Sequence, residues 1–188
     1  LNPEFVFNLS LLTANHYLNK DYHQTLKTLE SFSEKDEFYY WFKLKKISQI
    51  MSKEKNNKKS LNFINSKFKK IKDPSVKIVF DIANINKNAK QYKLAIKYYD
   101  QILLKIDVNS AFYSGILYRR GSSYERLGDY KKSDKDLLKS LEVNPDDSYV
   151  LNYLAYSWLE RKYKIDTALQ MLEKAYESRS NDPYIIDS

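Results

Sequence analysis

The chain has no cysteine and is short of glycine and proline. Among its 188 residues there are 3 glycines and 4 prolines. The absence of cysteine excludes a disulfide framework, a thiolate metal site and a cysteine nucleophile. An all-β fold is also disfavoured, because its many tight turns draw on glycine and proline. The apolar share of 43% is enough for a buried core, so we expect a helical protein without covalent cross-links.

Long apolar runs and the residues of common catalytic sites are scarce as well. No apolar run reaches the length of about 18 residues that a membrane-spanning helix needs. The two histidines, His16 and His23, do not have the i, i+4 spacing that places two metal ligands on one helical face. Glycine-rich phosphate loops and serine elbow motifs are missing too. We therefore expect no enzyme, no catalytic or metal-binding residues and no cofactor.

Positive charge is concentrated in one part of the sequence. The chain carries 32 basic and 24 acidic residues, a net charge of +8. Residues 41–75 alone hold 11 lysines against 2 acidic residues, a net +9, so the rest sums to −1. Such a cluster could meet phosphates, an anionic membrane or an acidic partner. It has no arginine and no alternating aromatic residues for base stacking, so we expect solvated lysines and disfavour nucleic acid as a partner.

A pattern of small and bulky residues recurs along the chain. In its clearest copy, residues 114–147, two helices are joined at Gly128, which can end the first helix in a left-handed conformation. Gly121 lies where two helix backbones would approach closely, and Pro145 stops the unit. We expect the bulky residues, Tyr130 included, to form the core. The signature positions of all units are Leu117, Gly121, Tyr124, Gly128, Tyr130, Pro145, Ala83, Ala95, Ala155, Ala168 and Ala175.

The repeats divide the chain into one continuous array. The predicted units are 6–40, 41–75, 76–113, 114–147 and 148–182, with 183–188 opening a sixth. Both N-terminal units lack glycine, so we expect them to be irregular helix pairs. The chain starts with Leu1 rather than methionine and stops inside a unit, so we expect a fragment of a longer protein. Its compartment, cytoplasmic or exported, stays open.

These residues resemble the tetratricopeptide repeat family over essentially the whole chain, and residues 152–158 and 181–188 are similar to bacterial members. The resemblance implies an all-α fold, a right-handed superhelical solenoid of antiparallel helix pairs. It also implies that the first helix of each pair lines a concave groove. The implied function is a non-catalytic scaffold that binds a protein or peptide partner.

One stripe on the last full unit is a candidate binding surface. Tyr149, Asn152, Tyr153 and Tyr156 follow the spacing i, i+3, i+4, i+7 of one helical face. Tyrosine offers a large contact area at low entropic cost, and asparagine can bind backbone amides. The alternative is that the stripe packs on a further unit or a neighbouring chain. The predicted peptide-groove residues are Tyr149, Asn152, Tyr153, Tyr156, Tyr118, Arg119, Ser122, Asn84, Lys87, Lys45 and Gln49.

The family resemblance suggests one specific ligand that this sequence disfavours. Some members bind C-terminal carboxylates through lysine, asparagine and arginine on three successive first helices. Lys45 and Arg119 match that pattern by place, but Gln49, Asp81 and Gly115 replace its other residues. An aspartate would repel a carboxylate, so we do not expect this clamp. Two alternatives to groove binding stay open: an electrostatic binder of RNA or anionic surfaces, and a structural segment that self-assembles.

Overall fold

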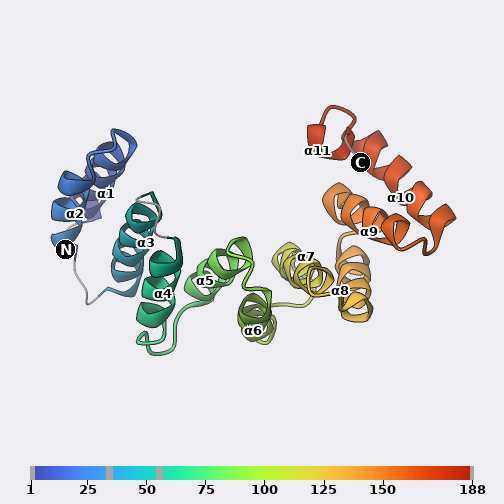
Figure 1. Cartoon of the computed structure of the whole chain (residues 1–188), viewed down its shortest axis with the longest axis horizontal. Helices are drawn as coiled ribbons and strands as arrows, with labels where there is room; N and C mark the ends of the chain where they lie inside the picture. The colour runs from blue at the N-terminus through green and yellow to red at the C-terminus, as the bar shows by residue number, and fades with distance from the viewer. Residues whose placement is uncertain (1–2, 33–35, 54–56, 187–188) are drawn as a thin grey trace. The chain divides into compact units, whose positions relative to one another are not determined.

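In the computed structural model, residues 3–32, 36–53 and 57–186 are described, and these are all-α, with no strand among them (Figure 1). The predicted fold class is confirmed. Residues 54–56 of the lysine-rich turn and 187–188 of the expected sixth unit lie outside the described residues. The helices are α1 Pro3–Leu18, α2 Tyr22–Glu30, α3 Glu37–Lys53, α4 Asn57–Phe68, α5 Val76–Asn88, α6 Tyr92–Leu103, α7 Ala111–Glu125, α8 Tyr130–Val143, α9 Ser148–Glu160, α10 Ile165–Ser178 and α11 Pro183–Ile186.

The helices form two compact units, Leu1–Ile78 and Val79–Ser188, and each is described by itself. In the first unit, α1 packs on α2 and α3 packs on α4. Leu29 and Phe32 are buried at 1% and 4% exposure, and Phe32 contacts the ring of Phe42 at 5.4 Å between centroids. The predicted bounds of the five repeats stay predictions.

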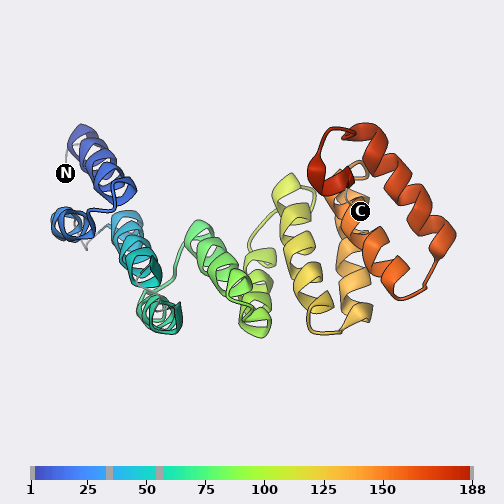
Figure 2. The same ribbon diagram turned by 45° about the horizontal axis from the view of Figure 1, so that its top comes forward.

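The second unit has its densest core between α8, α9 and α10. Leu137, Leu154 and Ala168 are fully buried there, and Trp158 is 2% exposed. α7 pairs with α8 and α9 pairs with α10, while α11 packs on both α9 and α10. Figure 2 shows these helices side by side, in yellow to red. The first helices of successive pairs, α7 and α9, also contact each other, which is what positions the candidate site.

Gly121 marks the closest approach of α7 and α8, as its place in the repeat predicts. A Cβ added there would lie 3.0 Å from Leu137 Cγ and 3.1 Å from Asp136 Cβ. These distances are shorter than nine in ten real Cβ contacts, so a side chain here would require α8 to move by a few tenths of an ångström. Glycine at this position lets the two backbones approach.

Four of the described turns inside helix pairs use one backbone conformation with different residues. Gly128 has φ +76°, and the next N–H, of Asp129, donates to Tyr124 O at 3.0 Å, a pattern that ends helices in the left-handed region. Lysines take the glycine's place in three other turns: Lys20, Lys90 and Lys162 have φ of 61°, 60° and 54°. A residue other than glycine is unfavourable in the left-handed region, so a lysine in the sequence does not indicate such a turn. The sequence therefore predicts only the turn that contains Gly128.

Tyr130 is not a core residue, contrary to the expectation from its repeat position. Its side chain is 41% exposed, and its ring lies 4.5 Å from the guanidinium of Arg161. The aromatic ring covers an arginine rather than filling the interior. Tyr98, Tyr99 and Trp158, expected in the core on the same grounds, are buried at 5% exposure or less.

Candidate functional site

Three first helices of the second unit contact one another through aromatic and cationic side chains. The ammonium of Lys87 on α5 lies 5.7 Å from the ring centre of Tyr118 on α7. That ring packs edge-on against Tyr153 of α9, with 5.7 Å between centroids. The guanidinium of Arg119 lies 5.2 Å from the ring of Phe80 on α5. We call this connected row the α5–α7–α9 surface; its members are Phe80, Asn84, Lys87, Tyr118, Arg119, Glu125, Arg126, Tyr153 and Tyr156.

Two hydrogen bonds between neighbouring helices fix polar groups in this row. Tyr153 donates its hydroxyl to Glu125 Oε2 at 2.7 Å, and Tyr99 donates to Asn84 Oδ1 at 2.7 Å. Burial, followed by the bond to Glu125, raises the pKa of Tyr153. Burial also raises the pKa of Tyr99. Both hydroxyls therefore stay protonated near neutral pH and keep donating.

A hollow of about 250 Å³ opens beside Tyr153. Tyr156 lies at the edge of this hollow and is 48% exposed, so part of its ring is not packed in the core. The lining combines aromatic surface with charges of both signs, which suits a peptide better than a purely apolar ligand. Its lining residues are Glu125, Arg126, Tyr153, Tyr156, Ser157 and Glu160.

Sequence reasoning missed several residues of this hollow. Arg126, Ser157 and Glu160 were not among the predicted groove residues. Arg126 and Glu160 nevertheless follow Ser122 and Tyr156 by four residues, and so continue the same helical faces. Extending each predicted stripe by one turn would have found them.

The cations of this surface carry an unusual charge balance. Burial, together with the nearby Arg119 and Arg126, lowers the pKa of Lys87 to about 8. Within the described parts of the chain, neither Lys87 nor Arg119 makes an ion pair. Arg126 lies 3.4 Å from Glu125 but is 60% exposed. Among the described residues, Lys87 and Arg119 thus lie on this surface without an ion pair, whereas Arg126 lies beside Glu125.

The other partly buried arginines of the unit are neutralised. Arg120 donates to both carboxylate oxygens of Asp136 and to Asp100, each at 2.7 Å. Burial alone would lower the pKa of Arg120, but the bonds from Asp136 and then Asp100 outweigh it and raise that pKa. Arg161 donates to both oxygens of Asp134, at 2.8 and 3.3 Å. These pairs hold helices together and leave no charge for a ligand.

Some predicted groove residues do not reach the surface. Asn152 and Ser122 are each 2% exposed, because the packing of α7 and α9 turns their side of the helix inward. The expectation that they face a groove is therefore wrong for these two side chains. Ser122 donates its hydroxyl to Arg119 O at 3.0 Å. A spacing of three residues spans about 300° of the helix, so one member of a stripe can fall on the buried side.

Three further predicted residues lie apart from the row. Tyr149, at the start of α9, donates its hydroxyl to Asp182 at 2.7 Å, and the guanidinium of Arg179 lies 4.9 Å from its ring centre. It therefore contacts the segment after α10. Lys45 and Gln49 belong to α3 of the first unit, where Lys45 is half-buried and Gln49 exposed.

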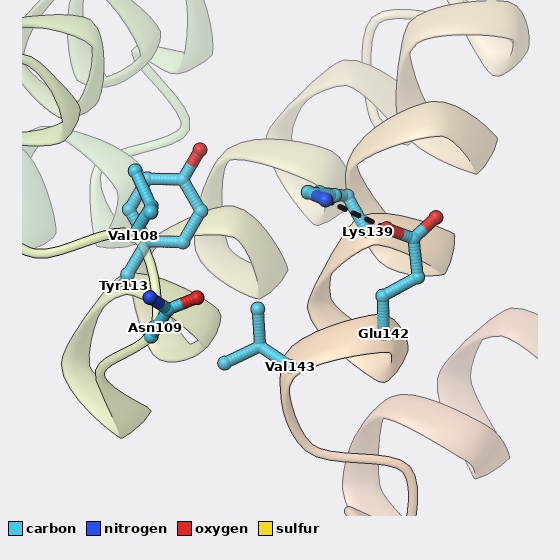
Figure 3. Close-up of a pocket in the computed structure, with 6 residues that line it drawn as sticks. All are labelled: Val108, Asn109, Tyr113, Lys139, Glu142 and Val143. Carbon is cyan, nitrogen blue, oxygen red and sulfur yellow. Dashed lines mark hydrogen bonds and ion pairs between the residues drawn. The ribbon is translucent and has the colours of Figure 1, made fainter.

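A second hollow, of about 490 Å³, lies between the segment before α7 and the end of α8 (Figure 3). Val108, Asn109 and Tyr113 line one side, and Val143 lies opposite. Its charged groups, Lys139 and Glu142, pair with each other at 2.7 Å, as the dashed line in Figure 3 marks. Because these charges compensate each other, this hollow offers less for recognition than the α5–α7–α9 surface.

The described residues provide neither a metal site nor a membrane-spanning helix. No group of three or more histidine, aspartate and glutamate side chains is placed to hold a metal ion there. None of the helices in the described ranges combines the length and apolar character needed to cross a membrane. The α5–α7–α9 surface is therefore the strongest candidate that the described residues provide.

Comparison with known proteins identifies the repeat. The family model for the tetratricopeptide repeat matches residues 114–147. A TPR repeat-containing protein of Pseudomonas aeruginosa is 32% identical over 73 residues, which is 39% of this chain and 12% of that protein. This source fits the bacterial origin that the sequence suggested. The chain thus matches only a small part of its curated relative.

Solved structures show the same fold. MamA from Desulfovibrio magneticus RS-1, from residue 41 to its end, has a TM-score of 0.69 at 14% identity, over 93% of this chain and 95% of that one. A MamA RS-1 double mutant gives 0.69 at 16% identity, over 93% and 94% of the two chains. A MamA AMB-1 structure gives 0.62 at 16%, over 97% and 95%. The likeness establishes an α-solenoid of helix pairs.

Proposed function

Because the chain is a tetratricopeptide-repeat protein, and such repeats are protein-interaction scaffolds, we propose that its α5–α7–α9 surface binds a peptide segment of a partner protein. The observation that carries this proposal is the continuous row from Lys87 through Tyr118 to Tyr153, which ends at the hollow beside Tyr156. The row crosses three helices, so a bound segment would contact all of them. The chain acts as a scaffold and performs no chemistry on its ligand.

The side chains of this row divide the work of recognition. Tyr156 offers exposed ring surface, the type of anchor that contributes most to interface affinity. Asn84 accepts from Tyr99 through its oxygen, and among the described residues its NH₂ group donates to nothing. That group can donate to a backbone carbonyl of an extended ligand. Tyr118 and Tyr153 support the surface from below, because both are partly buried.

Peptide selection on the full chain tests this proposal. Random dodecapeptides would be displayed and enriched, and the affinity of each winner measured by calorimetry against the wild type and Tyr156→Ala. Removing an aromatic anchor is expected to weaken binding at least tenfold, which corresponds to about 1.4 kcal/mol. At position 153, alanine would also disturb the core. The variant used there is therefore Tyr153→Phe, which removes only the hydroxyl.

Tyr176→Ala is the matched control, because Tyr176 is a similarly exposed tyrosine, at 52%, on the second helix α10. It should leave peptide affinity unchanged. Failure to enrich any peptide, or equal affinity of Tyr156→Ala and the wild type, would refute groove binding. If the molar mass measured by light scattering increases with protein concentration in the absence of peptide, the self-assembling alternative would be favoured.

The lysine cluster of the first unit supports a second candidate, an electrostatic binder of RNA or anionic surfaces. Lys58, Lys59, Lys69, Lys70 and Lys72 are exposed and make no ion pair within the described residues. Lys46 is different, because its ammonium lies 4.7 Å from the ring of Tyr17. Charge reversal at the exposed lysines should abolish such binding, and its affinity should fall steeply with salt.

A further inference from the structure

We propose that the segment bound by the α5–α7–α9 surface is rich in proline and adopts the polyproline II conformation. This inference rests on the proposed peptide binding and specifies the chemistry of the ligand. Two observations carry it: all three helices place aromatic rings along the surface, and the polar side chains there offer more hydrogen-bond donors than acceptors. Proline suits both features, because its ring packs on aromatic side chains and its nitrogen has no hydrogen to donate.

Each of the three helices contributes aromatic rings. Phe80 of α5 packs edge-on against Phe112, which adjoins the surface at the start of α7, with 5.4 Å between ring centroids. Farther along α7, Tyr118 packs in the same manner against Tyr153 of α9. Phe112 and Tyr156 are 40% and 48% exposed, so ring surface is accessible on both α7 and α9. Polyproline segments bind grooves that are lined by such rings.

The polar side chains of α5 and α7 mainly donate. Asn84 accepts from Tyr99 through its oxygen, which leaves its NH₂ group to donate. Arg119 donates from Nη1 to Gly115 O at 3.0 Å, and its other N–H groups have no acceptor among the described residues. The ammonium of Lys87 lies over an aromatic ring and has no acceptor in that part of the chain either. A ligand backbone that presents carbonyl oxygens therefore meets several donors.

Most acceptors of this surface are already engaged. Glu125 accepts the hydroxyl of Tyr153 at 2.7 Å, lies 3.4 Å from Arg126, and is only 14% exposed. Asp81 of α5 also interacts with another residue. Glu160, at the end of α9, is exposed and makes no hydrogen bond or ion pair with the described residues. A ligand with an N–H at every residue would leave most of these groups without an acceptor, which costs binding free energy.

This balance of donors and acceptors distinguishes the backbone conformations that a ligand can adopt. An extended strand binds through backbone hydrogen bonds to the edge of a sheet, and the described residues contain no strand. A helix uses its carbonyls internally, so it would leave the donors of Asn84 and Arg119 without a ligand acceptor. A polyproline II segment has no internal hydrogen bonds, so its carbonyls stay free. Its backbone therefore matches the surface best.

The period of polyproline II also fits the spacing of the helices. α7 and α9 contact each other, and the axes of packed helices lie about 8–10 Å apart. Polyproline II has three residues per turn and rises about 3.1 Å per residue, so residues i and i+3 lie on one side, about 9 Å apart. Two prolines at this spacing can each contact the rings of one helix, the first near Tyr118 and the second near Tyr156. Because free proline-rich segments already adopt this conformation, binding costs them little entropy.

Two peptides that differ only in proline test the inference on the full chain. They are acetyl-(Pro-Pro-Gln)₄-amide and its alanine counterpart, acetyl-(Ala-Ala-Gln)₄-amide, and their affinities would be measured by calorimetry. Both peptides are uncharged, so electrostatic attraction does not contribute to the difference. We expect the proline peptide to bind about tenfold more tightly, because its rings pack on the aromatic side chains and it has fewer N–H groups to desolvate.

Variants then locate the bound segment. Tyr156→Leu keeps apolar area but removes the ring, so it should weaken the proline peptide about fivefold, whereas Tyr156→Phe should bind it like the wild type. Asn84→Asp keeps the oxygen that accepts from Tyr99 and removes the NH₂ donor, so it should also weaken the peptide about fivefold. Tyr176→Leu, at an exposed tyrosine of the second helix α10, is the matched control and should change nothing.

The outcomes separate this inference from the proposed function. If the alanine peptide binds as tightly as the proline peptide, or if Tyr156→Leu binds the proline peptide like the wild type, the polyproline inference is wrong. Peptides selected from the random library that lose affinity on Tyr156→Ala would then still support peptide binding. If neither the selected peptides nor the proline peptide binds, both proposals are refuted. Enrichment of prolines three residues apart among the selected peptides would support both.

Discussion

Arg119 and Arg120 are consecutive residues of α7, yet they meet opposite surroundings. Arg120 points toward α6 and α8 and makes three hydrogen bonds to Asp100 and Asp136. Arg119 points toward α5, where it meets a phenylalanine ring, its own helix backbone and another cation. One helix thus carries a neutralised arginine on one face and an uncompensated one on the other.

The difference separates two uses of positive charge. A partly buried arginine that is fully paired belongs to the fold, since removing it leaves a carboxylate without its partner. An arginine beside other cations adds little to the fold and is available to a partner molecule. The two glycines of α7 differ in the same way. Gly121 packs against α8, whereas Gly115 lies near Arg119.

Among the substitutions considered, replacement of Arg120 should lower the free energy of unfolding the most. Arg120→Ala leaves Asp136, whose side chain is 7% exposed, as a buried uncompensated charge. Breaking such a pair typically costs about 3–5 kcal/mol of unfolding free energy. Urea unfolding followed by circular dichroism measures it. Arg119→Ala, the neighbouring control, should change the unfolding free energy by less than about 0.5 kcal/mol; equal losses for both would refute the distinction.

Gly121→Ala should show the next largest effect, on the packed face of α7. The new methyl group would lie 3.0 Å from Leu137 Cγ and 3.1 Å from Asp136 Cβ, and neither atom is the end of a flexible side chain. Overpacking of this kind destabilises proteins by about 1–3 kcal/mol. The same urea titration measures the loss, and a gain in stability would show that α7 and α8 are less tightly packed than described.

Lys87→Met should increase stability by about 1 kcal/mol near pH 7, since it removes a partly buried cation that Arg119 and Arg126 repel. The sign follows from the lowered pKa. At a pH between about 8, the pKa of Lys87 in the folded protein, and 10.5, its ordinary pKa, the unfolded chain binds more protons than the folded one. Wild-type stability therefore rises with pH in that window.

The pH profile provides the control for this change. The methionine variant should lack the rise, so the stability difference between the two proteins should shrink from pH 7 to pH 10. Thermal unfolding at a series of pH values measures it. If the methionine variant is less stable than the wild type, the charge of Lys87 stabilises the fold, as that of Arg120 does.

Gly115→Ala should have the smallest effect and the opposite sign from Gly121→Ala. Its new Cβ would meet only Arg119 Nη1, at 3.5 Å, an ordinary contact with a flexible side chain. Alanine in place of glycine inside a helix stabilises it by about 0.5–1 kcal/mol. A rise in the melting temperature is the expected result, and a loss would mean that this face of α7 is also packed.

The array itself was predictable from the sequence because its signals are local. Gly121, Gly128 and Pro145 combine steric and backbone requirements that few other residues meet, and the pattern of small and bulky residues around them recurs at a near-constant period. The lysine-containing turns were harder to find, since Lys90 and Lys162 adopt the same left-handed conformation without any turn signal in the sequence. Only the helices on either side of them showed where they lie.

The candidate site was predictable in its helices but not in each side chain. The helical faces carrying Tyr118, Arg119 and Tyr156 do lie on one surface of the second unit. Asn152 belongs to the same spacing but is buried, because which side of a stripe packs inward depends on the neighbouring helix. The charge balance around Lys87 depends on residues of α7, more than 30 positions away, and no local pattern reveals it.

The bonds of Arg120 also bear on how the array opens. In a solenoid, each helix pair touches only its neighbours, and these interfaces decide which parts unfold together. Arg120 links α7 to Asp136 of α8 and to Asp100 of α6, so one side chain spans two successive pairs. The amide protons of these three helices should therefore exchange with solvent as one cooperative block. A partner that pulls on α7 would meet the resistance of the whole block rather than of a single helix.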